Sequence, residues 1–235
     1  PLLDHMKKAP PLAPIQIMLI GDSATAGLNA AGSFRRYLDG MLRRQGLLID
    51  FVGSRNKHRN NTTAPDSYEF DVDHEGHWGK DSGWLAEHMP GQLTGAAPDI
   101  AVLHIGTEDI VAGTTAAEPL TDAIAGNIGS VIRSLRAKNP AVKIVLAKII
   151  PARGKTAEVA LLNRKISDLA EANSTARSPM VAADLAAGFD IPEDLDAGGS
   201  LPAPSGARKM AAVLARAISQ MAGDQDQRQA PRERP

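Results

Sequence analysis

Residues 15–27, IQIMLIGDSATAG, decide how this chain folds. The segment begins with an apolar run of strand-forming residues and breaks off at Gly21, Asp22 and Ser23. This pattern predicts a buried strand that delivers the Ser23 hydroxyl to the carboxyl end of a parallel sheet, where open α/β proteins form their ligand crevice. In the alternative, purely structural interpretation, Asp22 and Ser23 only cap a helix and turn the chain.

Strand-like and helix-like stretches alternate along the rest of the chain. Continuous apolar runs predict further strands over 47–53, 99–105, 142–150 and 179–185. Apolar residues at helical spacing predict helices over 34–45, 84–89, 120–137, 156–172 and 205–221. The alternation predicts an α/β fold, a three-layer sandwich in which a five-stranded parallel sheet has helices on both faces.

The length of 235 residues and the 43% hydrophobic content suit one compact domain, which we place at 15–222. Residues 1–14 are proline-rich and without periodicity, and we predict a disordered or tag-derived arm there. Residues 223–235, GDQDQRQAPRERP, predict a disordered polar tail. No signal-peptide pattern is seen, so the default expectation is a cytoplasmic protein, with a processed secreted form left open.

The composition limits the classes of molecule that this protein is expected to bind. A net charge of -1 gives no support for binding to nucleic acid or to an anionic membrane surface. No apolar run approaches the ~20 residues needed to cross a bilayer. The absence of cysteine excludes thiolate metal sites, and the acidic and histidine residues over 71–77 lack a diagnostic ligand spacing. We therefore predict neither a metal nor another cofactor, and the expected ligand is a small molecule. The long polar stretch 54–80 is expected to cover the site.

Five stretches together resemble the SGNH (GDSL) hydrolases, and within them the acetyl esterases of carbohydrate esterase family 3. In chain order they are IMLIGDSATAG, GLLIDFVGS, DHEGHWG with the nearby SGW, IGTEDI, and PSGARKMA. The resemblance covers about residues 15–221 and implies the SGNH hydrolase fold. It also implies that the ancestral protein was a serine esterase that acted on small acylated or glycosylated substrates. It implies a serine nucleophile, an oxyanion hole made by the serine N–H, a glycine N–H and an asparagine amide, and a histidine base oriented by an aspartate.

Two of the family's functions carry over directly. Ser23 takes the position of the nucleophile, with Asp22 beside it in the oxyanion and binding region. The glycine of the oxyanion hole is Gly79 or Gly83, because the register after His77 is ambiguous. Both glycines also have a structural interpretation as turn residues.

The asparagine position holds Glu108, in Gly106-Thr107-Glu108-Asp109. An ionised carboxylate cannot donate a hydrogen bond. At ~4 Å from a developing oxyanion it would oppose the charge by about 4 kcal/mol at an effective dielectric constant near 20. Only a Glu108 kept protonated by burial could act as a donor.

The aspartate and histidine positions are also changed, to Gly198 and Leu201, and no histidine follows His104. His104 falls in a predicted buried strand and is expected to be a neutral core residue. Asp194 and Asp196 have no imidazole to orient, so we expect them in a solvated loop. His77 and His74 are the candidates for a surrogate base; alternatively, they position their loop.

Three hypotheses follow from these changes. The first is a serine esterase with a rearranged base, whose ordinary activity we predict to be weak or absent. The second is a cleft used for non-hydrolytic chemistry on a metabolite, such as an elimination, isomerisation or cyclisation, by Glu108 and Ser23. The third is a non-catalytic module that binds a small molecule or carbohydrate.

Overall fold

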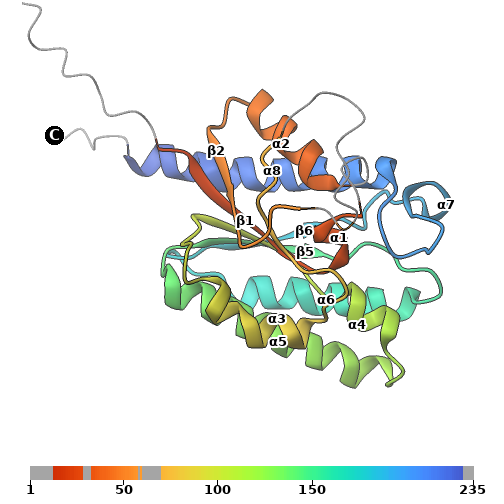
Figure 1. Ribbon diagram of the computed structural model, residues 1–235. Helices are drawn as coiled ribbons and strands as arrows, with labels where there is room; N and C mark the ends of the chain where they lie inside the picture. The colour runs from red at the N-terminus through yellow and green to blue at the C-terminus, as the bar shows by residue number, and fades with distance from the viewer. Residues whose placement is uncertain (1–12, 29–32, 58, 60–69, 230–235) are drawn as a thin grey trace, which may run out of the picture.

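A parallel sheet lies between two layers of helices in the computed structural model, which describes residues 13–28, 33–57, 59 and 70–229 (Figure 1). The strand order is β2-β1-β4-β5-β6, and a short β3 pairs with β1. This confirms the predicted three-layer α/β sandwich and the SGNH hydrolase fold. The sheet has one strand more than the five predicted.

The strands agree closely with the apolar runs of the sequence. They are β1 (Ile15–Gly21), β2 (Ile49–Val52), β3 (Glu75–Gly76), β4 (Ile100–His104), β5 (Lys143–Lys148) and β6 (Met180–Asp184). Strand β4 is buried along its whole length, as expected of a parallel strand with helices on both sides. Strand β3 pairs with the last two residues of β1, beyond the end of β2. Two residues are too few to produce a periodic signal, which is why the sequence did not reveal β3.

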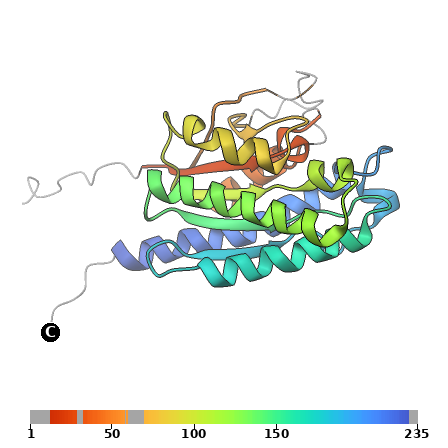
Figure 2. The same ribbon diagram turned by 90° about the horizontal axis from the view of Figure 1, so that it is seen from below.

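Helices cover both faces of the sheet and also gather at the carboxyl ends of its strands. They are α1 (Ser23–Ala26), α2 (Phe34–Arg44), α3 (Ser82–Gln92), α4 (Thr107–Ala112), α5 (Ala117–Lys138), α6 (Thr156–Asn173), α7 (Ile191–Asp194) and α8 (Pro204–Gln229). Helices α2 and α8 cover one face, and α3, α5 and α6 lie side by side on the other (Figures 1 and 2). The short helices α1, α4 and α7 follow β1, β4 and β6, so they lie at the edge of the sheet where the candidate site forms.

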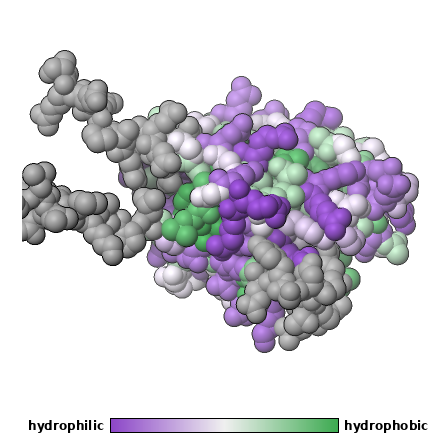
Figure 3. Space-filling model, turned by 90° about the horizontal axis from the view of Figure 1, so that it is seen from above, coloured by the Kyte–Doolittle hydropathy of each residue, from purple (hydrophilic) through white to green (hydrophobic). Residues whose placement is uncertain are grey.

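Two apolar layers hold the sandwich together. Leu85, Ile128 and Leu162 belong to the layer between the sheet and α3, α5 and α6, while Leu38 and Leu214 belong to the layer under α2 and α8. Each helix therefore buries the stripe that its sequence periodicity predicts. Hydrophilic residues predominate on the outer face above α2 and α8 (Figure 3).

Helix α8 continues to Gln229, into the segment predicted to be a disordered tail. Residues 224–229 contain no proline, and an existing helix extends through polar residues more readily than a new one begins. Residues 230–235 of the predicted tail and 1–12 of the predicted arm lie outside the described residues. Among the helices that the structure describes, none is long and apolar enough to cross a membrane.

Candidate active site

Ser23 lies at the carboxyl end of β1, where the sequence predicted it. Asp22 is the N-cap of α1, and its Oδ1 atom accepts a hydrogen bond from the Ala24 N–H at 3.1 Å. The Ser23 side chain is almost buried, and its Oγ accepts a hydrogen bond from the Gly79 N–H at 2.8 Å. The turn thus both caps a helix and presents a hydroxyl to a backbone donor.

The structure separates the two candidate glycines. Gly79 has φ +67°, a left-handed conformation that favours glycine. Its segment is anchored to β1, because the His77 N–H donates to the Gly21 carbonyl at 2.8 Å. Gly83, in contrast, lies in the first turn of α3, near the side chains of Asp81 and Asn127. Gly79 is therefore the glycine whose N–H meets the serine hydroxyl.

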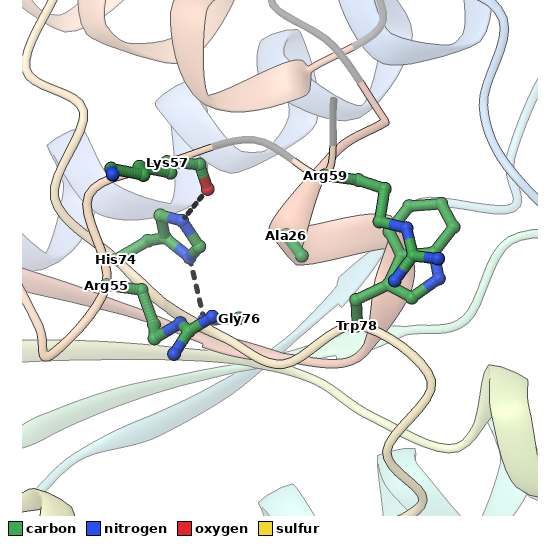
Figure 4. A pocket seen from close by; sticks show the side chains of 7 residues that line it. All are labelled: Ala26, Arg55, Lys57, Arg59, His74, Gly76 and Trp78. Atoms are coloured by element: carbon green, nitrogen blue, oxygen red, sulfur yellow. Dashed lines mark hydrogen bonds between the residues drawn. The ribbon is translucent and has the colours of Figure 1, made fainter. Parts of the chain in front are cut away.

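Both ring nitrogens of His74 are engaged in loop contacts. Nδ1 accepts a hydrogen bond from the Gly76 N–H at 2.9 Å, so the proton lies on Nε2, which is 3.0 Å from the Lys57 carbonyl oxygen (Figure 4). The side chain is 1% exposed. These contacts favour the interpretation in which His74 positions its loop.

His77 pairs with a buried carboxylate. Its Nε2 lies 2.5 Å from Oε1 of Glu75, which is fully buried and also accepts hydrogen bonds from the N–H and the hydroxyl of Ser54. The imidazole ring contacts the Trp84 ring at a centroid distance of 4.6 Å. Among the described residues, no imidazole nitrogen is within hydrogen-bond distance of the Ser23 hydroxyl.

A buried acid and a buried imidazole lie beneath the serine turn. Oδ2 of Asp22 accepts the Thr107 N–H at 3.1 Å, which ties the end of β1 to the start of α4. His104 is fully buried, its Nδ1 is 4.0 Å from Oδ1 of Asp22, and its ring nitrogens have no hydrogen-bond partner in the described part of the chain. Burial raises the pKa of Asp22 to about 7, with a further contribution from the negative charge of Glu108, and burial lowers the pKa of His104 to about 4. His104 is thus the neutral core residue that the sequence predicted.

Helix α4 carries Glu108 and Asp109 in its first turn. Glu108 is half-buried, and its charge acts on Asp22. Asp109 joins α4 to α3, because its carboxylate accepts hydrogen bonds from the N–H and the hydroxyl of Ser82 at 2.9 and 2.6 Å. Burial raises the pKa of Asp109. The charges of both acids raise the pKa of Asp22, that of Glu108 by more, and Asp109 in addition has a structural partner in Ser82.

The expectation of a solvated loop is wrong for Asp194. This side chain is 1% exposed, and its Oδ2 accepts hydrogen bonds from Lys209 Nζ at 2.6 Å and from the Asp190 N–H at 2.7 Å. Burial alone would raise the pKa of the carboxyl group, but these hydrogen bonds outweigh it and lower the pKa. Lys209 comes from α8, fifteen positions further along, which explains why local sequence did not reveal the pair.

Gly198 and Leu201 lie in a loop built around Asp196. Oδ1 of Asp196 accepts hydrogen bonds from three consecutive N–H groups, those of Gly199, Ser200 and Leu201, at 2.8, 3.3 and 3.1 Å. Backbone pairing of Leu195 with Pro202 closes the loop. The aspartate side chain thus organises the loop backbone, and its carboxylate has no imidazole partner within the described part of the chain.

A model of the GDSL-like lipase/acylhydrolase family matches residues 19–209. The chain belongs to this family. Its fold matches a carbohydrate esterase family 3 structure from Talaromyces cellulolyticus, which is 31% identical with a TM-score of 0.78 over 89% of this chain and 99% of that one. A family 3 carbohydrate esterase of Clostridium thermocellum is 26% identical, with a TM-score of 0.74 over 90% and 98% of the two chains.

A curated relative is far longer than this GDSL-family chain. The multidomain esterase of Ruminococcus flavefaciens is 28% identical in an alignment of 222 positions that covers 83% of this chain and 27% of that protein. The chain therefore spans about a quarter of the length of this relative. These comparisons establish a GDSL hydrolase fold with esterase homologues.

The sequence analysis of this GDSL-family protein missed a group of cations near the serine turn. Arg55, Lys57 and Arg59 line a cavity of about 360 Å³ together with Trp78 (Figure 4). The alternation of basic residues in RNKHR, directly after the second predicted strand, was the available signal. Over 13–28, 33–57, 59 and 70–229, no group of three or more histidine, cysteine or acidic residues could hold a metal ion.

Proposed function

We propose that this protein holds a small acylated or glycosylated molecule at Ser23 and that its ordinary esterase activity is weak or absent. One observation carries the proposal: the Ser23 hydroxyl receives the Gly79 N–H, but no imidazole of the described residues reaches it. A serine hydroxyl is a weak nucleophile unless an adjacent base takes its proton. The site therefore has a backbone N–H that can stabilise a developing negative charge. Among the described residues, however, no imidazole is placed to accept the proton of the Ser23 hydroxyl.

The expected loss of activity is large. A positioned general base contributes roughly 10²–10⁴-fold to a rate. Loss of one oxyanion donor costs roughly 2.7–4 kcal/mol, and Glu108 stands where an amide donor is expected. Together these changes are sufficient to reduce ester hydrolysis to a small fraction of that of an enzyme with an intact site.

A second candidate function is non-hydrolytic acid–base chemistry on a metabolite. It is supported by the acidic groups around the serine turn: burial, with a further contribution from the charge of Glu108, raises the pKa of Asp22 to a net value of about 7. A carboxyl group that titrates near the working pH suits proton transfer. If this function applies, Glu108→Gln abolishes turnover of the metabolite while Ser23→Ala retains it.

The decisive experiment compares the wild type with Ser23→Ala. We expect labelling by a fluorophosphonate to be slow, and hydrolysis of p-nitrophenyl acetate to stay within a few-fold of the Ser23→Ala rate. Rapid, stoichiometric labelling, with hydrolysis that Ser23→Ala abolishes, would overturn the proposal and identify an ordinary serine esterase. Mass spectrometry of the labelled peptide checks that any adduct is on Ser23.

A further inference from the structure

Two adjoining cavities of about 360 and 480 Å³ lie next to the serine turn and share Arg55, Arg59 and Trp78. Lys57 lines the first cavity, and Lys80 and Trp84 line the second. We call this combined surface the basic pocket, and define it by Arg55, Lys57, Arg59, Trp78, Lys80 and Trp84.

The four cations of the basic pocket are exposed, and none forms an ion pair with a carboxylate of the described residues. Two nearby acids already have partners. Glu75 is buried against His77 and Ser54, and Asp81 accepts the Trp84 N–H at the start of α3. A concentration of positive charge without carboxylate partners among the described residues is notable in a chain with a net charge of -1, and it attracts an anion.

Both tryptophans of the chain lie in this pocket, although aromatic residues make up only 3% of the sequence. Each is half-buried and carries a cation over its ring. Arg59 Cζ is 5.2 Å from the Trp78 ring centroid, and Lys80 Nζ is 5.3 Å from that of Trp84. Figure 4 shows the Arg59 guanidinium beside the Trp78 ring. These contacts orient the cationic groups. Trp84 is also stacked on His88 at a centroid distance of 4.1 Å, so Trp78 is the indole ring that provides apolar surface for a ring-containing ligand.

The pocket is joined to the serine through the chain itself. Trp78 and Lys80 flank Gly79, whose N–H donates to the Ser23 hydroxyl. Ala26, in the short helix that Ser23 begins, lines the first cavity. A molecule bound in the basic pocket therefore lies next to the residues that surround the hydroxyl.

We propose that the basic pocket binds the carboxylate or phosphate of a ring-containing substrate, so that the molecule presented to Ser23 is an acylated sugar acid or sugar phosphate. Arginine suits this recognition because its planar guanidinium binds both kinds of anion through paired hydrogen bonds. The assignment of the acyl group rests on the proposed function. Anion binding itself needs no reaction at Ser23.

Intrinsic fluorescence provides a direct test, because both tryptophans line the pocket. Glucuronate, glucose 6-phosphate and glucose are titrated into the wild type, Arg55→Gln and Arg59→Gln, with calorimetry as a second measure of Kd. The matched control is Arg133→Gln, which removes an exposed arginine from α5. Thermal melting and circular dichroism confirm that each variant is folded.

We expect saturable binding of at least one anionic sugar, weaker at high salt and at least tenfold weaker for glucose. Loss of either arginine should weaken Kd by about tenfold, whereas Arg133→Gln should bind like the wild type. The two anionic sugars distinguish a carboxylate from a phosphate ligand. The inference is overturned if neither anionic sugar binds, if glucose binds equally well, or if Arg55→Gln and Arg59→Gln retain wild-type affinity. Because binding is read without turnover, a failure here leaves the test of Ser23 reactivity unaffected.

Discussion

The residues at the two ends of the candidate site match the pattern of the family resemblance to different degrees. At the β1 end, the Ser23 hydroxyl accepts a hydrogen bond from the N–H of Gly79, one of the two glycines that the family resemblance assigns to the oxyanion hole. At the other end, the loop between Leu195 and Pro202 is organised by Asp196, with Gly198 and Leu201 where an aspartate and a histidine are expected. The same fold therefore carries a turn in which the serine hydroxyl meets a backbone donor, and a loop in which glycine and leucine occupy the positions that the resemblance assigns to an ionisable pair. Fold membership alone does not decide chemistry, because a few side chains do.

Restoring the second end should produce the largest effect. The triple variant Glu108→Asn, Gly198→Asp and Leu201→His places an amide donor, an orienting carboxylate and an imidazole at the three changed positions. We expect at least about a 100-fold increase in the hydrolysis of p-nitrophenyl acetate, because a positioned base alone contributes that much. Steady-state kinetics provides the measurement.

The control for this gain is the same triple variant with Ser23→Ala, which should lose it completely. If the triple variant folds but hydrolyses the ester no faster than the wild type, the β1 end cannot support ester hydrolysis. The proposed difference between the two ends would then be wrong.

Removing the buried anchor behind the loop should have an intermediate effect. Asp194→Ala eliminates the hydrogen bonds to Lys209 and to the Asp190 N–H, and we expect a loss of about 2 kcal/mol in the free energy of unfolding at neutral pH. Because the pKa of Asp194 is lowered in the folded state, its contribution is present above the pKa of an unfolded aspartate and is lost as the pH falls through the folded value. Urea denaturation at neutral and acidic pH measures both effects.

Asp168→Ala, an exposed acid on α6, is the matched control and should change stability by less than about 0.5 kcal/mol. Equal effects of the two substitutions would mean that Asp194 does not anchor the loop.

The smallest net effect is expected from the buried pair beneath Ser23, because its two members act in opposite directions. The raised pKa of Asp22, about 7, lowers stability as the pH rises from 4 to 7, since only the folded state then retains the proton. The lowered pKa of His104, about 4, raises stability as the pH rises from 4 to 6.5, since only the unfolded state is then protonated. The contribution of the pair in the wild type should therefore be nearly flat.

Single substitutions separate the two contributions. Relative to the wild type, the unfolding free energy of Asp22→Asn should increase between pH 4 and 7, and that of His104→Leu should decrease between pH 4 and 6.5. Chemical denaturation across this range tests both signs. Parallel pH profiles for the two variants would show that the pair does not titrate as described.

Local sequence alone determined the alternation of strands and helices, and with it the sandwich and the position of Ser23 at the end of β1. Such predictions succeed because hydrophobic periodicity is set by neighbours along the chain. The same locality explains the misses: β3 is too short to have a period, and the burial of Asp194 depends on a lysine from α8.

Tertiary structure decided the chemistry of the site. Ser23 and Gly79 are 56 positions apart, and only folding selects Gly79 over Gly83 as its donor. Folding also engages His77 with Glu75 and gathers the cations around Trp78. These features depend on distances between residues remote in the chain, which residue types and spacing do not encode.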